Sequence, residues 1–163
     1  MSAPHAVSIH SKSPEATERI ASHLADVLGP GDTLCLVGDL GAGKSLFARA
    51  IIRALTGETD IPSPTYTLVQ TYQAAEFTIW HTDLYRLSDP DEVAEIGLED
   101  AFDTALCLIE WPDRLAYLPN GALWIELANE GSDDHRQIRF KAGSDRWAEC
   151  LAALEGNRVT AND

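Results

Sequence analysis

The feature that most constrains the fold of this chain is the run from Gly38 to Ser45, which matches the pattern G-x-x-x-x-G-K-[ST]. Glycines let the backbone wrap around a polyphosphate with its N–H groups directed inward, and a following helix adds the positive end of its dipole. In such a loop Lys44 reaches the terminal phosphates and the Ser45 hydroxyl coordinates Mg²⁺. The run therefore predicts a phosphate-binding loop and a bound nucleotide.

The flanks of this loop have the pattern that the motif requires. Residues 32–37 form a short apolar run after Gly-Pro-Gly, as in a buried strand. Residues 44–55 place Leu46, Phe47, Ala50, Ile51 and Ala54 at helical spacing. A strand, a glycine-rich turn and a helix in this order make a chance match a poor explanation. The residues expected to contact the nucleotide are Asp39, Leu40, Gly41, Ala42, Gly43, Lys44, Ser45 and Leu46.

Length and hydropathy limit the class of protein. A chain of 163 residues suits one domain, predicted here at 1–155, with a disordered tail at 156–163. No apolar run approaches the roughly 20 residues of a membrane span, and no basic N-terminal region precedes an apolar stretch. We therefore expect a cytoplasmic location without membrane association.

The charge is informative mainly as an exclusion. The chain has 12 basic and 26 acidic residues, for a net charge of −14. A protein that binds nucleic acid alone needs a basic face, so independent binding to DNA or RNA is disfavoured. Two interpretations stay open: an acidic face that docks on a basic protein, or charge that only maintains solubility. No CxxC pair is present, so Cys35, Cys107 and Cys150 are interpreted as small core residues.

The remaining pattern predicts an α/β fold. Expected strands are 6–10, 32–37, 66–73, 76–83, 105–110, 122–127 and 137–141. Expected helices are one capped by Ser13, one at 44–55, a short one opened by 89–92, and one at 145–154. The pairs 66–73 with 76–83 and 122–127 with 137–141 are interpreted as hairpins, the second with a polar turn at 129–135. The prediction is a P-loop NTPase-like mixed sheet flanked by helices, with antiparallel hairpins added to a parallel core.

Two strands end in acidic residues that belong to the candidate site. The strand from Phe77 to Asp83 carries Ile79, His81 and Asp83 on one face, and the strand at 106–109 ends in Glu110. Ligands bind at the carboxyl ends of open α/β sheets, so neighbouring strands would bring these residues to the phosphate-binding loop.

Each of these side chains has a functional and a structural interpretation. An acid after four apolar residues is the Walker B arrangement, so Glu110 would hold Mg²⁺ or orient water. Asp83 is either part of this site or a cap of the following turn. A histidine at a position such as 81 is more often a hydrogen-bonded structural residue. Thr65 is either a hydroxyl that senses the γ-phosphate or a turn residue beside Pro64.

Taken together, five segments resemble the TsaE family (formerly YjeE or YdiB), the small bacterial ATPase of tRNA threonylcarbamoyladenosine synthesis. They are the loop at 38–45, Ser-Pro-Thr-Tyr-Thr-Leu-Val at 63–69, His-Thr-Asp-Leu-Tyr-Arg-Leu at 81–87, Glu-Ile-Gly-Leu at 95–98 and Ile-Glu-Trp-Pro at 109–112. The loop is shared by many ATPases, whereas the third and fifth segments in this order are specific to the family.

The resemblance implies a slow, Mg²⁺-dependent ATPase that acts with TsaD and TsaB, the proteins that transfer a threonylcarbamoyl group to an adenosine beside the anticodon. It implies that tRNA is contacted only through this complex. It also implies catalytic roles for Lys44, Thr65, Asp83 and Glu110, with Ser45 and Glu110 at the metal. Trp111 looks important for activity in the family, and Arg86 is a candidate arginine finger.

Two other functions were weighed against this one. The first is a stand-alone small-molecule kinase with Asp83 as base, although no Arg-rich segment suggests the basic lid that such enzymes usually have. The second is a binding protein gated by nucleotide, in which hydrolysis is incidental.

Overall fold

The computed structural model describes residues 6–39, 42–61, 69–85, 97–115, 118–119 and 121–156, without the side chains of 132, 133, 155 and 156. Its strands are β1 (Ala6–Ser11), β2 (Thr33–Val37), β3 (Val69–Gln73), β4 (Thr78–Asp83), β5 (Leu106–Glu110), β6 (Leu123–Glu130) and β7 (Ser132–Ala142). Its helices are α1 (Pro14–Ala25), α2 (Lys44–Thr56), α4 (Leu98–Thr104) and α5 (Ala148–Gly156), with 3₁₀ turns η1 (Pro112–Arg114) and η2 (Asp145–Trp147).

Several predictions fall outside the described residues. They concern Leu40, Gly41, Thr65, Arg86, the helix opened by 89–92 and the tail after Gly156.

All the strands join one sheet of seven, in the order β1-β7-β6-β2-β5-β4-β3. The pairs β6–β2, β2–β5 and β5–β4 are parallel. The pairs β1–β7, β6–β7 and β3–β4 are antiparallel. The sheet is therefore a parallel core with antiparallel strands added at both edges, and the predicted fold class is confirmed.

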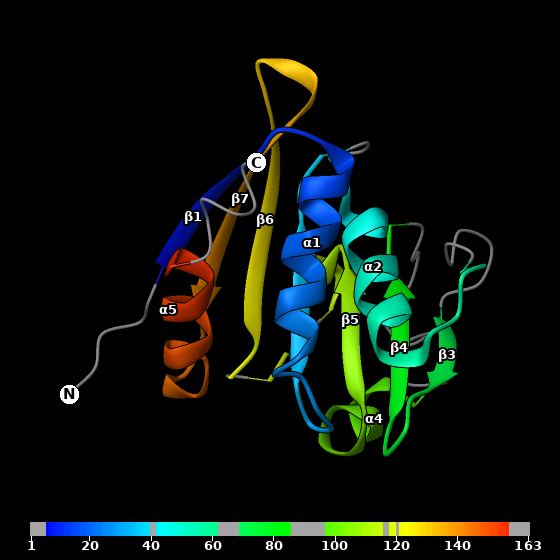
Figure 1. The fold of residues 1–163 in the computed structure, drawn as a ribbon. Coiled ribbons are helices and arrows are strands. Elements are labelled where there is room, and N and C mark those ends of the chain that lie inside the picture. The colour runs from blue at the N-terminus through cyan, green and yellow to red at the C-terminus, as the bar shows by residue number, and fades with distance from the viewer. Residues whose placement is uncertain are drawn as a thin grey trace.

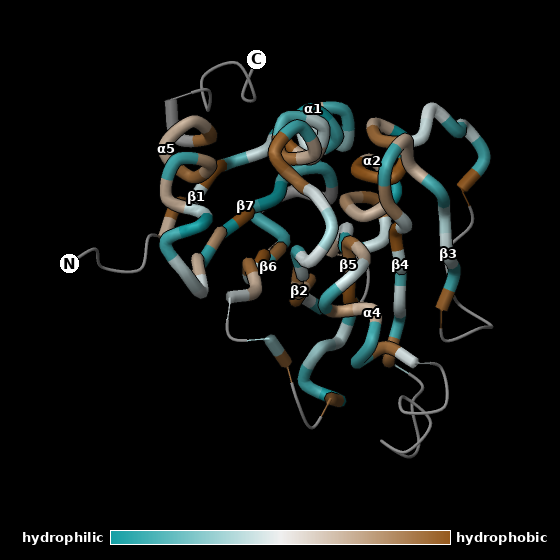
Figure 2. Tube along the Cα trace, turned by 90° about the horizontal axis from the view of Figure 1, so that it is seen from below, coloured by the Kyte–Doolittle hydropathy of each residue, from teal (hydrophilic) through white to brown (hydrophobic). Residues whose placement is uncertain are grey.

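Helices cover both faces of the sheet. Figures 1 and 2 show α1, α2 and α5 on one face and α4 on the other. On the first face, Phe47 and Ile51 of α2 pack in the main hydrophobic core with Leu34, Leu36 and Leu108 of the central strands. On the second face, α4 and β5 contribute to a smaller cluster that includes Phe102, Cys107 and Ile109. Because β5 is apolar on both faces, it is buried along its whole length, as parallel strands usually are.

The predicted starts of the first two helices are confirmed, whereas the helix predicted from 145 begins at Ala148 after a 3₁₀ turn at 145–147. Ser13 caps α1, where its side chain accepts a hydrogen bond from the Ala16 N–H at 3.1 Å. In α2 the predicted stripe is buried at Phe47, Ala50 and Ile51, but Ala54 is exposed and Ile52 is buried instead. The predicted helical spacing is confirmed, and Ala54 lies on the exposed side of the last turn.

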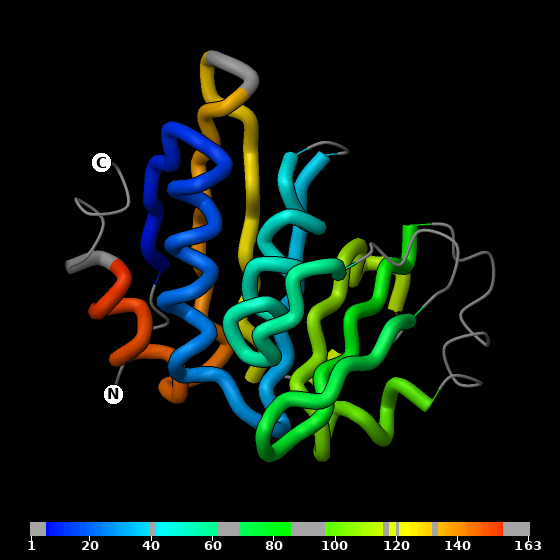
Figure 3. The backbone as a smooth tube through the Cα atoms, turned by 45° about the vertical axis from the view of Figure 1, so that its right-hand side comes forward, coloured from blue at the N-terminus to red at the C-terminus, as the bar shows by residue number. Residues whose placement is uncertain are grey.

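The predicted polar turn at 129–135 is also wrong. β6 continues to Glu130 and β7 begins at Ser132, so Gly131, with a φ of 80°, forms the turn. This hairpin extends beyond the carboxyl ends of the core strands (Figures 1 and 3). A strand that leaves the core needs no apolar face, so its polar composition resembled a loop. The short helix α4 was also not predicted.

The three cysteines are free and buried, as predicted. Burial raises the pKa of the Cys35 and Cys107 thiols to about 12, so these groups stay protonated and behave as small apolar residues. Among the residues described, no helix has the length and apolar character to cross a bilayer.

Candidate functional site

The candidate site lies where the parallel core strands end. β2 leads into the loop at 38–43, and β5 and β4 lie beside it in the sheet. The register pairs Leu36 with Glu110 and Glu110 with Asp83, so both acids reach the edge from which the loop departs. Paired residues of parallel strands point to the same face, and Ile79 and Leu108 on this face pack in the core with α2. Glu110, Asp83 and His81 therefore lie on the side covered by α2.

Gly38 allows the loop to begin. Its φ is 153°, and a Cβ atom at this position would lie 2.4 Å from the carbonyl oxygen of Leu127 in β6. The contact is with backbone, which cannot move aside as a flexible side chain can. Any residue other than glycine would therefore displace the loop from the sheet.

Lys44 is held against the described part of the loop. Its Nζ donates to the carbonyl oxygens of Gly38, at 2.6 Å, and Asp39, at 2.9 Å. It also lies 4.5 Å from the centroid of the Trp111 ring. Burial lowers the pKa of Lys44, while the carboxylates of Glu110, Asp83 and Asp39 oppose this shift. The ammonium group therefore stands at the centre of the acidic residues and beside the position where phosphates would bind.

Glu110 is the polar centre of the site. Its carboxylate accepts from the Ser45 hydroxyl at 3.0 Å to Oε1 and 2.9 Å to Oε2, and its Oε2 lies 2.7 Å from Nε2 of His81. Glu110 is 3% exposed and His81 is fully buried. A buried carboxylate requires such partners, because burying a charge without them is costly.

These oxygen atoms suit Mg²⁺. A hydroxyl and a carboxylate side by side are hard oxygen ligands, the type that Mg²⁺ prefers. In the parts of the chain that the structure covers, no group of three or more His, Cys, Asp or Glu side chains could hold a metal ion by itself. Mg²⁺ at Ser45 and Glu110 would therefore complete its coordination with water and phosphate oxygens, as is usual for this ion.

Asp83 stabilises the turn after β4 and also lies beside the other candidate site residues. Its Oδ1 accepts a hydrogen bond from the Tyr85 N–H at 3.0 Å, so it does stabilise the turn after β4. It also lies beside Glu110 in the register and interacts electrostatically with Lys44. Burial raises the pKa of Asp83, and Glu110 contributes in the same direction. A carboxylate with a raised pKa at a strand end suits proton transfer.

Trp111 has an unusual backbone. Its φ is 61°, a positive value shared by no other non-glycine residue in the described ranges. The ring contacts Lys44 and also Tyr85, whose ring centroid is 4.8 Å away. Strained backbone of this kind often occurs at functional sites. Spacing alone carried no signal for this residue, and only the Ile-Glu-Trp-Pro segment of the family resemblance indicated it.

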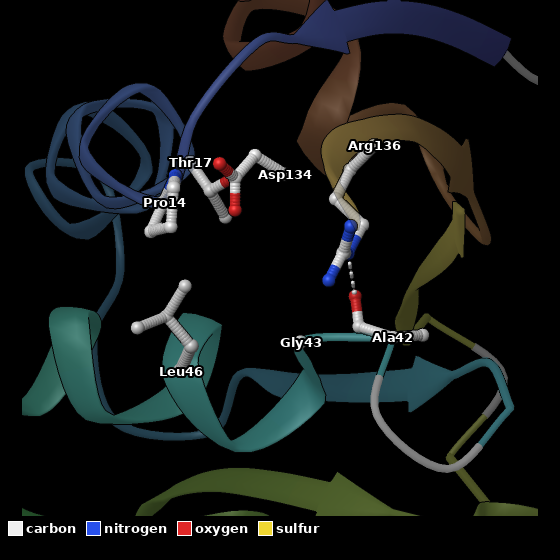
Figure 4. A pocket seen from close by; sticks show the side chains of 7 residues that line it. All are labelled: Pro14, Thr17, Ala42, Gly43, Leu46, Asp134 and Arg136. Atoms are coloured by element: carbon white, nitrogen blue, oxygen red, sulfur yellow. Dashed lines mark hydrogen bonds between the residues drawn. The ribbon is translucent and has the colours of Figure 1, made fainter. Parts of the chain in front are cut away.

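A pocket adjoins the loop on the side away from β5. It is lined by Pro14, Thr17, Ala42, Gly43, Leu46, Asp134 and Arg136 (Figure 4). Arg136 extends from β7 and its Nε donates to the carbonyl oxygen of Ala42 at 2.9 Å. Sequence reasoning included Ala42, Gly43 and Leu46 but missed the other residues of this pocket. No local pattern could reveal them, because α1 and β7 meet the loop only in the folded chain.

Comparisons with known proteins agree with this architecture. The model of the family described as "Threonylcarbamoyl adenosine biosynthesis protein TsaE" matches residues 11–138. A TsaE protein of Rickettsia conorii is 46% identical over 127 residues, or 77% of this chain and 72% of the relative. The TsaE protein of Bacillus subtilis is 37% identical over 136 residues, which cover 82% of this chain and 84% of the relative. The crystal structure of Bacillus subtilis YdiB superimposes with a TM-score of 0.76 at 30% identity, over 96% of this chain and 99% of that chain.

Proposed function

The chain belongs to the TsaE family of tRNA threonylcarbamoyladenosine biosynthesis proteins, and we propose that it is the Mg²⁺-dependent ATPase of this modification. The observation that carries the proposal is the contact of Ser45 with Glu110, at 2.9 and 3.0 Å. It joins the hydroxyl that ends the phosphate-binding loop to the acid that ends β5. These are the two protein groups that hold Mg²⁺ in P-loop NTPases.

Each residue of the site has a proposed role in binding or proton transfer. When bound, Mg²⁺ supplies positive charge to the phosphate oxygens. Lys44 would leave the carbonyl oxygens of Gly38 and Asp39 and neutralise the terminal phosphates. Asp83 would orient or deprotonate the attacking water, a role that its raised pKa supports. The pocket beside the loop is lined by Ala42, Gly43 and Leu46 of the predicted phosphate-binding segment, and its position would suit the nucleoside.

The rest of the proposal depends on the family. We propose that the protein acts in the cytoplasm on the TsaD–TsaB complex, contacts tRNA only through it, and carries out no threonylcarbamoyl transfer itself. Thr65 would respond to the γ-phosphate, and Arg86 is the candidate for a finger in cis. A finger that is missing, or that is not held in place without the partners, lowers the rate by about 10³-fold or more, so a slow ATPase in isolation is expected.

The proposal is tested by measuring ATP hydrolysis with the protein alone and after addition of TsaD and TsaB. We expect slow turnover alone, stimulation by the partners, and no turnover without Mg²⁺. Glu110→Gln should lower kcat by about 100-fold or more while ADP still binds, because the metal loses a carboxylate ligand. Lys44→Ala should weaken nucleotide binding itself. Glu126→Gln is the matched control, since Glu126 pairs with Lys141 on the surface of β6.

Two outcomes would contradict the proposal. Strong turnover by the isolated protein that partners leave unchanged would exclude a partner-stimulated ATPase, and transfer of phosphate to a metabolite would indicate a kinase. If Glu110→Gln binds ATP without hydrolysing it and still supports repeated rounds of tRNA modification, nucleotide occupancy alone is the functional signal.

A further inference from the structure

The buried histidine beside the site, His81, is not explained by the packing of the sheet. It lies in β4 between Ile79 and Asp83 on one face and pairs with Leu108 of β5. Its exposed fraction is 0%. A strand position with apolar neighbours of this kind normally holds a β-branched residue, because a buried imidazole has polar nitrogens that need partners.

Among the described residues, the side chain of His81 forms a hydrogen bond only with Glu110. Nε2 lies 2.7 Å from Glu110 Oε2, which as a carboxylate oxygen accepts the Nε2 proton. Nδ1 is buried and has no hydrogen-bond partner among the described residues. One nitrogen of the ring is therefore left without a partner while the other contacts the acid of the site, a cost that a packing role alone does not account for.

This contact limits how the Glu110 carboxylate can turn. Oε2 accepts from both His81 and Ser45, and Oε1 also accepts from Ser45. If Ser45 turns its oxygen toward a metal ion, its hydrogen bond to the carboxylate is lost or rearranged. The His81 hydrogen bond would then remain as the fixed contact of the carboxylate. In metal sites, partners of this kind orient the ligand, and their loss lowers metal affinity or activity by about 10- to 100-fold.

We propose that His81 is a positioning residue that holds the Glu110 carboxylate in place for the Mg²⁺–nucleotide complex. The inference rests on the proposed function, since it assigns Glu110 to the metal. His81 itself takes no part in the chemistry, and the group that matters is the Nε2–H donor.

The test uses substitutions that differ in where they place a donor. His81→Gln puts an amide N–H close to the position of Nε2, whereas the shorter His81→Asn places its amide near Nδ1, out of reach of Glu110. His81→Leu removes the donor and keeps an apolar side chain. His23→Gln, at an exposed position of α1, is the control for the substitution itself. Folding is checked by circular dichroism and thermal unfolding.

Three quantities are measured on the full chain. They are ADP affinity without divalent metal, by calorimetry; Mn²⁺ affinity of the ADP complex, by electron paramagnetic resonance; and kcat with its Mg²⁺ dependence. We expect His81→Leu and His81→Asn to lower Mn²⁺ affinity by about 10- to 100-fold while metal-free ADP affinity changes less than about twofold. His81→Gln should recover most of the Mn²⁺ affinity.

The inference is overturned if folded His81→Leu binds Mn²⁺ as the wild type does, or if the Gln and Asn variants lose affinity equally. If His81→Leu does not fold, the comparison of Gln with Asn decides alone. A wild-type protein that neither binds Mn²⁺–ADP nor hydrolyses ATP would overturn the proposed function, and the inference with it. If the wild type hydrolyses ATP and the His81 variants bind Mn²⁺ as tightly as the wild type does, only the inference is overturned.

Discussion

At the scale of single residues, Asp83 is destabilising in the folded chain in a way that depends on pH. Burial raises the pKa of Asp83 above the ordinary 3.8, and Glu110 adds to this rise. The hydrogen bond from the Tyr85 N–H lowers the pKa, as do His81 and Lys44 to a smaller extent. Between its unfolded and folded pKa values, Asp83 binds more protons in the folded chain than in the unfolded one. Its contribution to stability therefore decreases as pH rises through this interval and is fully unfavourable above the folded pKa.

Replacing Asp83 with Asn should remove this effect. The amide oxygen can still accept from the Tyr85 N–H. We expect the free energy of unfolding of Asp83→Asn to increase relative to wild type as pH rises from about 4, and then to level off. If Asp83 is the base, kcat should fall by about 10²- to 10⁴-fold. Urea unfolding at a series of pH values measures the first effect, with exposed Asp60→Asn as control. A stability difference that is independent of pH would contradict it.

Gly38 gives a second test at this scale. Gly38→Ala should destabilise the protein by about 3 kcal/mol or more, because its Cβ would meet the Leu127 carbonyl oxygen at 2.4 Å. Gly57→Ala is the matched control: φ is 79° there, but no atom lies within 4 Å of the added Cβ, so only backbone strain of about 1–2 kcal/mol is expected. If urea unfolding shows that Gly38→Ala and Gly57→Ala lose the same free energy of unfolding, the contact with Leu127 is unimportant.

At the scale of elements, the β6–β7 hairpin supports the phosphate-binding loop from outside the parallel core. β6 places the Leu127 carbonyl against Gly38, and β7 places Arg136 on the Ala42 carbonyl. The hairpin tip also contributes Asp134 to the pocket (Figure 4). The antiparallel strand β7, which is added to the parallel core, therefore contributes to the site as well as extending the sheet.

Removing the Arg136 side chain should consequently weaken nucleotide binding. Hydrogen bonds from charged groups contribute about 1.5–3 kcal/mol, so Arg136→Ala should raise the ADP Kd by about 10- to 100-fold. The ADP Kd of Arg136→Lys should lie between those of the wild type and Arg136→Ala, since an ammonium group lacks the planar fork of guanidinium. Calorimetry without Mg²⁺ makes the measurement, and Arg139→Ala on an exposed position of the same strand is the control. Unchanged ADP affinity in Arg136→Ala would exclude this role for the hairpin.

At the scale of the whole molecule, the net charge of −14 concerns partners and not the fold. A chain of this charge repels phosphate backbones, which agrees with contact to tRNA through other proteins only. Whether the charge also helps docking on a basic partner is decided by salt dependence. Charge complementarity is screened by salt, whereas burial of apolar surface is not.

We expect the affinity for TsaD–TsaB to fall by about 10-fold between 50 and 300 mM NaCl, mainly through slower association. Binding of the isolated protein to tRNA should be undetectable at the higher salt concentration. Surface plasmon resonance measures both. An affinity that does not change with salt would favour the interpretation that the acidic residues serve solubility alone.

The sequence by itself determined the features that depend on neighbours along the chain. The loop at 38–45, the Ser13 cap and the strand that ends in Glu110 all follow from local patterns, because hydrogen bonds and side-chain direction repeat at fixed spacing. The parallel core and its antiparallel additions were predictable for the same reason. The polar extension of the β6–β7 hairpin through 129–135 was not predicted, because it has no apolar face. The short helix α4 was also missed, although Leu98, Ala101 and Phe102 lie at helical spacing.

Only the tertiary structure decided which residues meet. Strand order brings His81 and Ser45 to the same carboxylate, and it brings Arg136 to a loop far from it in sequence. It also decides that Asp83 is buried enough for its pKa to rise and that Trp111 lies on Lys44. These contacts depend on how the strands are arranged side by side in the sheet. Periodicity along one segment carries no information about that arrangement.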